Sequence, residues 1–209
     1  MSHVGQEVLR RPEEEMSFAV AAALGVDESS WRCFLSLLAP LADHDICSYL
    51  HCLRVGIYAA RLASFAGAKG VDPVVALQGG TAHDLGKLDV PHAVLHARPF
   101  GQAERQVVSH HALAGFHRLR ETNYQVAVIA GLHQAFQHDP YGLEPGPSVP
   151  KDLLATTRLV AMCDVFDAVL TRVGSPGHRD PTMARQIAER YFPDQRGWGQ
   201  WLAANPVPA

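Results

Sequence analysis

The sequence predicts an all-α protein. Apolar residues recur every three or four positions along most of the chain, which is the period of an amphipathic helix. No segment shows the strict alternation of apolar and polar residues that is typical of a half-buried strand. Hydrophobic residues make up 47% and charged residues 19% of the 209 residues, an ordinary globular composition with enough apolar material for one core. We therefore expect one helical domain with short helices added to it.

Residues 1–45 are expected to form helices that pack on the main domain. Helical spacing predicts one helix over Met16–Leu24 and a second over Trp31–Leu41, which stops near Pro40. The cap candidates before the second helix are Asp27, Ser29 and Ser30.

The main domain is expected over residues 46–192. Its predicted helices are Ile46–Phe65 (ending at Gly67), Asp72–Asp84, Gln102–Leu119, Tyr124–Gln137, Asp152–Thr171 and Pro181–Tyr191. A loop rich in proline and glycine, Asp139–Pro150, is long enough to indicate a functional or mobile segment. The tail, residues 193–209, carries Trp198 and Trp201, which we expect to pack on the body of the domain.

The segment Thr81–Lys87 reads TAHDLGK and carries the most informative pair of residues, His83 and Asp84. An imidazole can bind one metal ion, and an adjacent carboxylate has two oxygens with which to bridge to a second. Gly86 is expected to end the helix and turn the chain, bringing Lys87 near an anionic group.

Four further polar residues each lie on a separate predicted helix beside inward-facing apolar residues. They are His51, His111, His133 and Asp164. Buried without partners, such groups would cost several kcal/mol in total, about 1–3 kcal/mol each, and a shared metal site removes that cost. The alternative is that each is a separately satisfied polar residue of the core or the surface.

The order H…HD…H…H…D resembles that of the HD-superfamily metal-dependent phosphohydrolases, and the local sequences resemble the HD-GYP branch, which hydrolyses cyclic di-GMP. The matching segments are HCLRV at 51–55, HDLGKLDVP at 83–91, HALAG at 111–115 and RLVAMCDVFDA at 158–168. The resemblance extends over residues 46–188. It implies an HD-domain helical bundle with a two-metal site between helices.

The resemblance also implies a role for each matching residue. The first metal would be bound by His51, His83, Asp84 and Asp164. The second would be bound by Asp84, His111 and His133. Lys87 matches the lysine that approaches the substrate phosphate, so Asp84 and Lys87 are the predicted catalytic residues. Two divalent transition-metal ions are expected, with Fe or Mn favoured over Zn, Co or Ni.

The chain departs from the HD-GYP pattern in one segment. Leu132 replaces one histidine of the usual pair, Gln134 replaces the glutamate, and the GYP tripeptide is lost. Cys47 stands where three-metal members have a glutamate. His138 or Asp139 could compensate in part, although a solvated loop pair is the simpler interpretation. These departures argue against a third metal and leave the substrate open.

We expect a phosphohydrolase that cleaves a cyclic dinucleotide or small nucleotide with a hydroxide shared by the two metals, while Lys87 neutralises phosphoryl charge. Two alternatives remain. One is a di-iron oxygenase on the same scaffold, and the other is a non-catalytic HD-GYP-like regulatory or binding module.

The expected partner is a small phosphorylated substrate, with cyclic di-GMP as one candidate, and a homodimer stays open. A net charge of −3 gives no basic excess for duplex nucleic acid. No apolar run approaches the roughly 20 residues of a membrane span, and Met1–Glu15 lacks the features of a secretory signal. The four cysteines form no CxxC pair and indicate reduced thiols. We therefore expect a cytoplasmic protein.

Several other polar residues are expected to be structural or solvated. The predicted surface histidines are His44, His92, His96, His110, His117 and His178. Arg54 and Asp167 are expected to form a structural pair, and Cys163 a core thiol.

Overall fold

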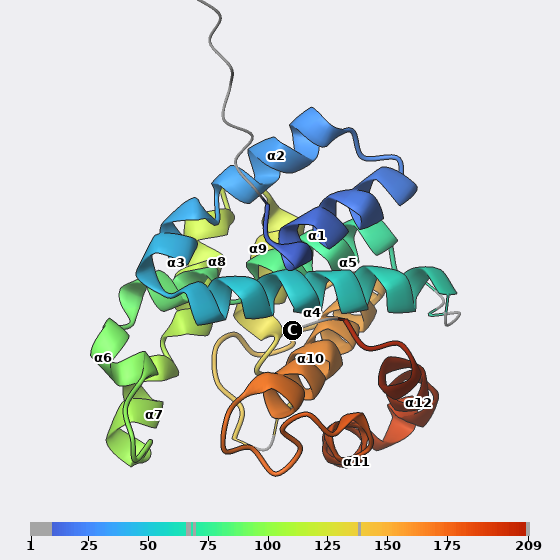
Figure 1. Ribbon diagram of the computed structural model, residues 1–209. Coiled ribbons are helices and arrows are strands. Elements are labelled where there is room, and N and C mark those ends of the chain that lie inside the picture. The colour runs from blue at the N-terminus through green and yellow to red at the C-terminus, as the bar shows by residue number, and fades with distance from the viewer. Residues whose placement is uncertain (1–9, 66–67, 69, 138, 208–209) are drawn as a thin grey trace, which may run out of the picture.

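The computed structural model describes residues 10–65, 68, 70–137 and 139–207, and every regular element in that part of the chain is helical. The all-α prediction is confirmed. Helix α4 (Ile46–Phe65) crosses the middle of the molecule, with α1 and α2 on one side and α10, α11 and α12 on the other (Figure 1). None of the described helices is long and apolar enough to cross a membrane. Gly67 lies outside the described residues, so the predicted end of this helix is not addressed.

Three short helices precede α4: α1 (Pro12–Ala23), α2 (Glu28–Ser36) and α3 (Ala39–His44). The Asp27 carboxylate accepts a hydrogen bond from the Ser30 amide at 2.9 Å and caps α2. The single helix predicted over Trp31–Leu41 is wrong, because α2 ends at Ser36 and Pro40 lies in the first turn of α3. Proline is tolerated in a first turn, where its missing N–H is not needed, so Pro40 begins a helix here and does not end one.

Helices α4 and α5 (Pro73–Ala82) cross at very close range. Gly56 and Gly80 face each other at the crossing, where a Cβ on Gly80 would lie 2.7 Å from the Gly56 Cα. A Cβ on Gly56 would lie 2.1 Å from the Thr81 Oγ1. The two glycines therefore permit a backbone contact that brings the middle of α4 beside the end of α5.

The middle of the chain is more broken than its apolar pattern suggests. The elements here are η1 (Leu85–Asp89), α6 (His92–Leu95), α7 (Gln102–Val108), α8 (His111–Leu119) and α9 (Tyr124–Leu132). The continuous helix predicted over Gln102–Leu119 is interrupted at Ser109 and His110, and the helix predicted to reach Gln137 ends at Leu132. Helices α6 and α7 form an arm that projects from the body (Figure 1).

The interruption between α7 and α8 has a local cause. The Ser109 hydroxyl donates to the Gln106 carbonyl at 2.7 Å, and the His111 Nδ1 lies 2.7 Å from the Val108 carbonyl. Side-chain donors of this kind compete with the backbone N–H groups that would otherwise continue the helix.

The C-terminal part contains α10 (Lys151–Thr171), α11 (Pro181–Tyr191), the single turn η2 (Pro193–Gln195) and α12 (Arg196–Ala204). Trp198 and Trp201 pack against the main hydrophobic core, as expected. The Val207 amide donates to the buried Tyr58 hydroxyl at 2.7 Å, which attaches the tail to α4.

Candidate metal centre

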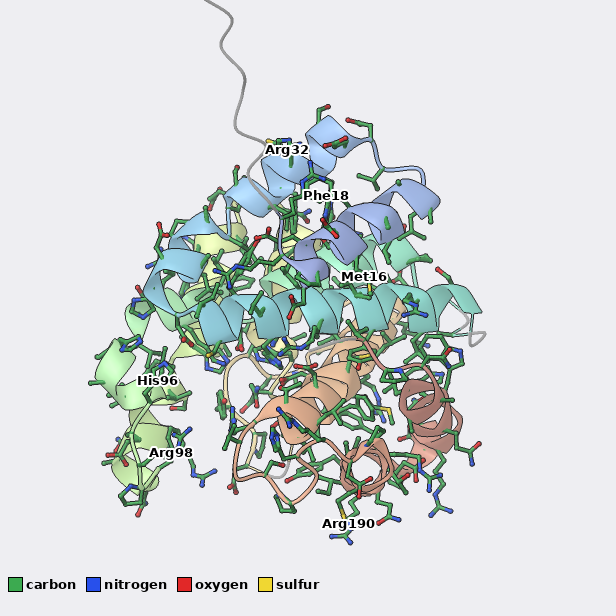
Figure 2. All side chains as sticks on the ribbon, in the orientation of Figure 1. Met16, Phe18, Arg32, His96, Arg98 and Arg190 are labelled. Carbon is green, nitrogen blue, oxygen red and sulfur yellow. The ribbon has the colours of Figure 1, made fainter. Side chains whose placement is uncertain are left out.

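The structure brings all six predicted ligands to one place between α4, α5, α8, α9 and α10. Their donor atoms form three overlapping groups, each within 4.8 Å: His51, His83 and Asp84; His83, His133 and Asp164; and Asp84, His111 and His133. Figure 2 shows side chains between α4 and α10, two of these helices. His83 and His133 are fully buried, and the other four are nearly so. Asp84 belongs to two groups, as expected of a carboxylate shared by two ions.

Each histidine is held by a hydrogen bond on its outer nitrogen. Three of them point Nδ1 at the carbonyl three residues earlier, at 2.7 Å in each case: His83 at Gly80, His111 at Val108 and His133 at Ala130. A carbonyl only accepts, so Nδ1 carries the proton and Nε2 presents a lone pair to the centre. Such bonds orient imidazoles that bind metals.

The separations between donor atoms suit small cations. The His111 Nε2 lies 3.0 Å from the Asp84 Oδ1 and 3.2 Å from the His133 Nε2. The His83 Nε2 lies 3.4 Å from the Asp84 Oδ2. Adjacent ligands of a transition metal with bonds of about 2.1 Å are about 3.0–3.4 Å apart, so these atoms are spaced as neighbours around an ion.

The electrostatics of the centre also call for positive charge. Burial alone would raise the pKa of Asp84, but Lys87 and His83 hold that pKa well below its ordinary value. Burial likewise opposes ionisation of Asp164, yet the hydrogen bond from His51 and the nearby imidazole of His83 keep its pKa well below normal. Burial, with the neighbouring imidazoles of His83 and His111, lowers the pKa of His133 to about 3. Two carboxylates are thus ionised beside a neutral imidazole.

Two buried atoms at this point have no hydrogen-bond partner in the described part of the chain: the His83 Nε2 and the Asp84 Oδ1. A buried polar atom without a partner costs about 1–3 kcal/mol, and metal ligation removes that cost. The nitrogen and oxygen donors, their spacing and these two unpartnered atoms all fit divalent transition metals.

Lys87 lies at the edge of the centre, with its Nζ 2.5 Å from the Asp84 Oδ2. Burial opposes the charge, but Asp84 raises the pKa of Lys87, so the ammonium persists. Gly86 does not act as the predicted helix terminator, because α5 already ends at Ala82. It permits close packing: a Cβ there would lie 1.9 Å from the His111 carbonyl oxygen.

The polar residues behind His51, on the side away from the centre, were predicted only in part. Arg54 and Asp167 form the predicted pair, with Nε to Oδ1 at 2.8 Å, and Asp167 is completely buried. The unforeseen contact is from the Asp167 Oδ2 to the His51 Nδ1 at 2.7 Å, which orients the imidazole. Arg54 also reaches Glu13 in α1 at 3.2 Å. The sequence signal for this arrangement was the spacing of His51 and Arg54, which places both on one face of α4, so that a partner of Arg54 can also reach His51.

The altered segment after His133 places two amides beside Asp164, and Asp139, the other candidate for compensation, lines the adjoining cleft. Gln134 and Gln137 each point Nε2 at the Asp164 Oδ2, at 3.3 and 3.2 Å. The Tyr141 ring lies edge-on to His111 with centroids 5.6 Å apart, and burial raises the pKa of its hydroxyl. Cys47 is exposed. His138 lies outside the described residues, so the suggestion that it compensates is not addressed.

The centre opens into a cleft of about 690 Å³. Its lining includes three cationic side chains, Lys87, Arg105 and Arg172, together with the aromatic rings of Phe100 and Tyr191. Both aromatic residues are exposed, and the Arg105 guanidinium lies 5.9 Å from the centre of the Phe100 ring. The cleft is therefore suited to an anionic ligand with planar groups.

The remaining predictions about single residues are mostly confirmed. Cys163 is fully buried, and His92, His96, His110 and His117 are exposed. His44 and His178 are half-buried and so less exposed than predicted. The His44 Nε2 lies 2.8 Å from the Val90 carbonyl, which packs the ring against the chain.

Comparison with known proteins identifies the family. The model of the HD domain matches residues 49–169, more than half of the chain. The chain belongs to the HD domain family. The resemblance drawn from the sequence is confirmed at the level of the superfamily; the assignment to the HD-GYP branch stays a prediction. As an HD domain the chain belongs to a family that binds divalent metals, while the number and identity of the ions remain predictions.

One curated relative and two solved structures are similar to this HD domain. The relative is the 3'3'-cGAMP-specific phosphodiesterase 2 of Vibrio cholerae, 26% identical over 144 residues, and the match covers 66% of this chain but only 27% of the relative. The structures are of the HD domain of the L. monocytogenes phosphodiesterase PgpH, one of them in complex with cyclic-di-AMP. Both are 17% identical with a TM-score of 0.57, covering 80% of this chain and 87% and 86% of theirs. They support the fold.

Proposed function

We propose that this HD domain hydrolyses a phosphodiester bond of a small cyclic dinucleotide at a two-metal centre. The observation that carries the proposal is the shared carboxylate: Asp84 directs Oδ1 toward His111 and Oδ2 toward His83. The names of the similar proteins, phosphodiesterases associated with cGAMP and cyclic-di-AMP, support this reaction class. Divalent cations bound here would polarise a phosphoryl group and lower the pKa of a water molecule.

The buried histidines and carboxylates would have one role in this reaction, and Lys87 another. The four imidazoles and two carboxylates form a rigid buried set, because each histidine is fixed from behind by an oxygen acceptor. Lys87 keeps its charge beside Asp84 and would contact a phosphoryl oxygen. Its ammonium is already positioned, so it can stabilise negative charge that develops on the phosphoryl group.

The cleft favours a dinucleotide over a mononucleotide. Lys87 at the centre and two arginines further out, Arg105 and Arg172, supply more positive charge than one phosphate requires. Phe100 and Tyr191 offer exposed rings on which bases could stack, a contact worth about 1–3 kcal/mol per base. The volume, about 690 Å³, falls within the usual range for small-molecule sites.

The test is a substrate panel with the full chain loaded with Fe²⁺ or Mn²⁺. The panel contains 3'3'-cGAMP, cyclic-di-AMP, cyclic-di-GMP and a mononucleotide, and products are separated by ion-exchange chromatography. We expect at least one cyclic dinucleotide to be opened to its linear form, with loss of activity in Asp84→Asn. Arg105→Gln and Arg172→Gln should raise KM by a larger factor than they lower kcat. Arg196 is an exposed arginine outside the cleft, so Arg196→Gln should change neither KM nor kcat. No turnover of any cyclic dinucleotide with either metal would refute the proposal, and oxygen consumption would favour the di-iron oxygenase.

A further inference from the structure

A second group of candidate ligands lies on the surface, away from the dinuclear centre. The donor atoms of Asp45, His92 and His96 lie within 4.8 Å of one another. Asp45 precedes α4, whereas His92 and His96 lie at the start and just past the end of α6, on the projecting arm where Figure 2 labels His96. None of these residues takes part in the centre described above.

We infer that Asp45, His92 and His96 bind one divalent transition-metal ion, with zinc as the best fit. Two histidines four positions apart lie on the same face of a helical turn, an arrangement that binds zinc in other proteins. Their ring centres are 4.4 Å apart. The His96 Nε2 lies 3.1 Å from the Asp45 Oδ1, close to the roughly 3.3 Å between ligands of a tetrahedral zinc with bonds of about 2.0–2.1 Å.

The carboxylate of this site is already oriented. The Asp45 Oδ2 accepts from the Ser48 amide at 3.1 Å and from the Ser48 hydroxyl at 2.6 Å, and Asp45 is 6% exposed. Burial opposes ionisation, but the bonds from Ser48 and His96 lower the pKa of Asp45, so the carboxylate is charged. An ion pair with His96 alone would satisfy Asp45 but would leave His92 with ring packing only, against His96 and His44. A metal ion uses all three side chains.

The position of this ion would connect the arm to the cleft. No residue of α6 or α7 is buried, so the arm is held by few core contacts. The arm nevertheless supplies Phe100, Gln102 and Arg105 to the cleft wall. A metal ion between Asp45 and α6 would fix the arm to the start of α4, the helix that carries His51. Zinc at this site would therefore order one wall of the cleft.

The test compares zinc binding by the full chain and by two histidine variants. After equilibrium dialysis against Zn²⁺, elemental analysis should give about one equivalent less for His92→Gln/His96→Gln than for the unaltered chain. His117→Gln removes another exposed histidine, outside this group, and should bind as much zinc as the unaltered chain. Zinc should also slow hydrogen exchange over residues 92–108, and the double variant should lose that protection.

Both histidines are exposed, so the metal-free melting temperature of the double variant should stay unchanged. If that variant does not fold, Asp45→Asn replaces it, because asparagine can still cap α4 while offering a weaker ligand. Equal zinc content in the unaltered chain and the variant, or an equal loss in His117→Gln, would overturn the inference. Because the dinuclear centre is intact in these variants, failure here would leave the proposed hydrolysis unaffected.

Discussion

The contact between Asp167 and His51 gives the sharpest test of how the centre is supported. Asp167 is fully buried and accepts from Arg54 at 2.8 Å and, on its other oxygen, contacts the His51 Nδ1 at 2.7 Å. Asp167→Asn keeps the size of the side chain and removes its charge. Among the described residues, Glu13 would then be the one anionic partner left to the buried Arg54 guanidinium, at 3.2 Å.

The cost follows from the burial. Removing one partner of a buried ion pair costs about 3–5 kcal/mol, and we expect about 3 kcal/mol because Glu13 still compensates part of the charge. In a chain of this size 1 kcal/mol shifts Tm by about 2–4 °C, so metal-free Tm should fall by about 6–12 °C. The affinity for the metal should also fall by about 10–100-fold, because asparagine offers a single acceptor oxygen to Arg54 and His51, where aspartate offers one to each.

The assay is thermal unfolding of the metal-free chain, followed by metal titration at a temperature where both proteins are folded. The matched control is Asp194→Asn, the same substitution in the exposed Arg158–Asp194 pair, which should cost no more than about 1 kcal/mol. A loss of Tm no larger than that of the control, with unchanged metal affinity, would refute this account of Asp167.

Three further changes test other parts of the centre. Gly86→Ala places a Cβ 1.9 Å from the His111 carbonyl oxygen, so the chain must shift. Urea unfolding should show a free energy of unfolding lower by about 1–3 kcal/mol, and the metal content should fall. An unchanged free energy of unfolding and an unchanged metal content would contradict the close packing. Gln134→Glu places a second carboxylate beside Asp164, so the metal-free Tm should fall. The rise in Tm on adding Mn²⁺ should then be larger than in the unaltered chain. An equal rise in the two proteins would contradict this prediction. Removing metal with a chelator should lower Tm, because the ion binds the folded state, and an unchanged Tm would argue against a bound ion.

The sequence was sufficient for the fold class and for the grouping of the six predicted ligands, because helical periodicity and the HD motif depend on residue types alone. It was not sufficient for the helix ends. His83 and His133 cap their helices and His111 follows a break, and each points Nδ1 at the carbonyl three residues earlier. Apolar periodicity continues through these points, so it predicted longer helices than the structure has.

Some contacts between distant segments were also beyond the sequence. Nothing local to Asp167 indicates that it reaches His51, 116 residues away. The group formed by Asp45, His92 and His96 depends on how the arm folds back toward α4, so residues that look like separate surface side chains become neighbours only in three dimensions.

The central claim is that Asp84 holds two metal ions at once. The most direct measurement is the metal content of the full chain and of Asp84→Asn, both loaded with Mn²⁺ under the same conditions and freed of excess metal. Because both carboxylate oxygens lie among histidine donors, we expect the variant to bind about two equivalents fewer, with its hydrolysis of cyclic dinucleotides abolished. Equal metal content and equal activity in the two proteins would contradict the claim.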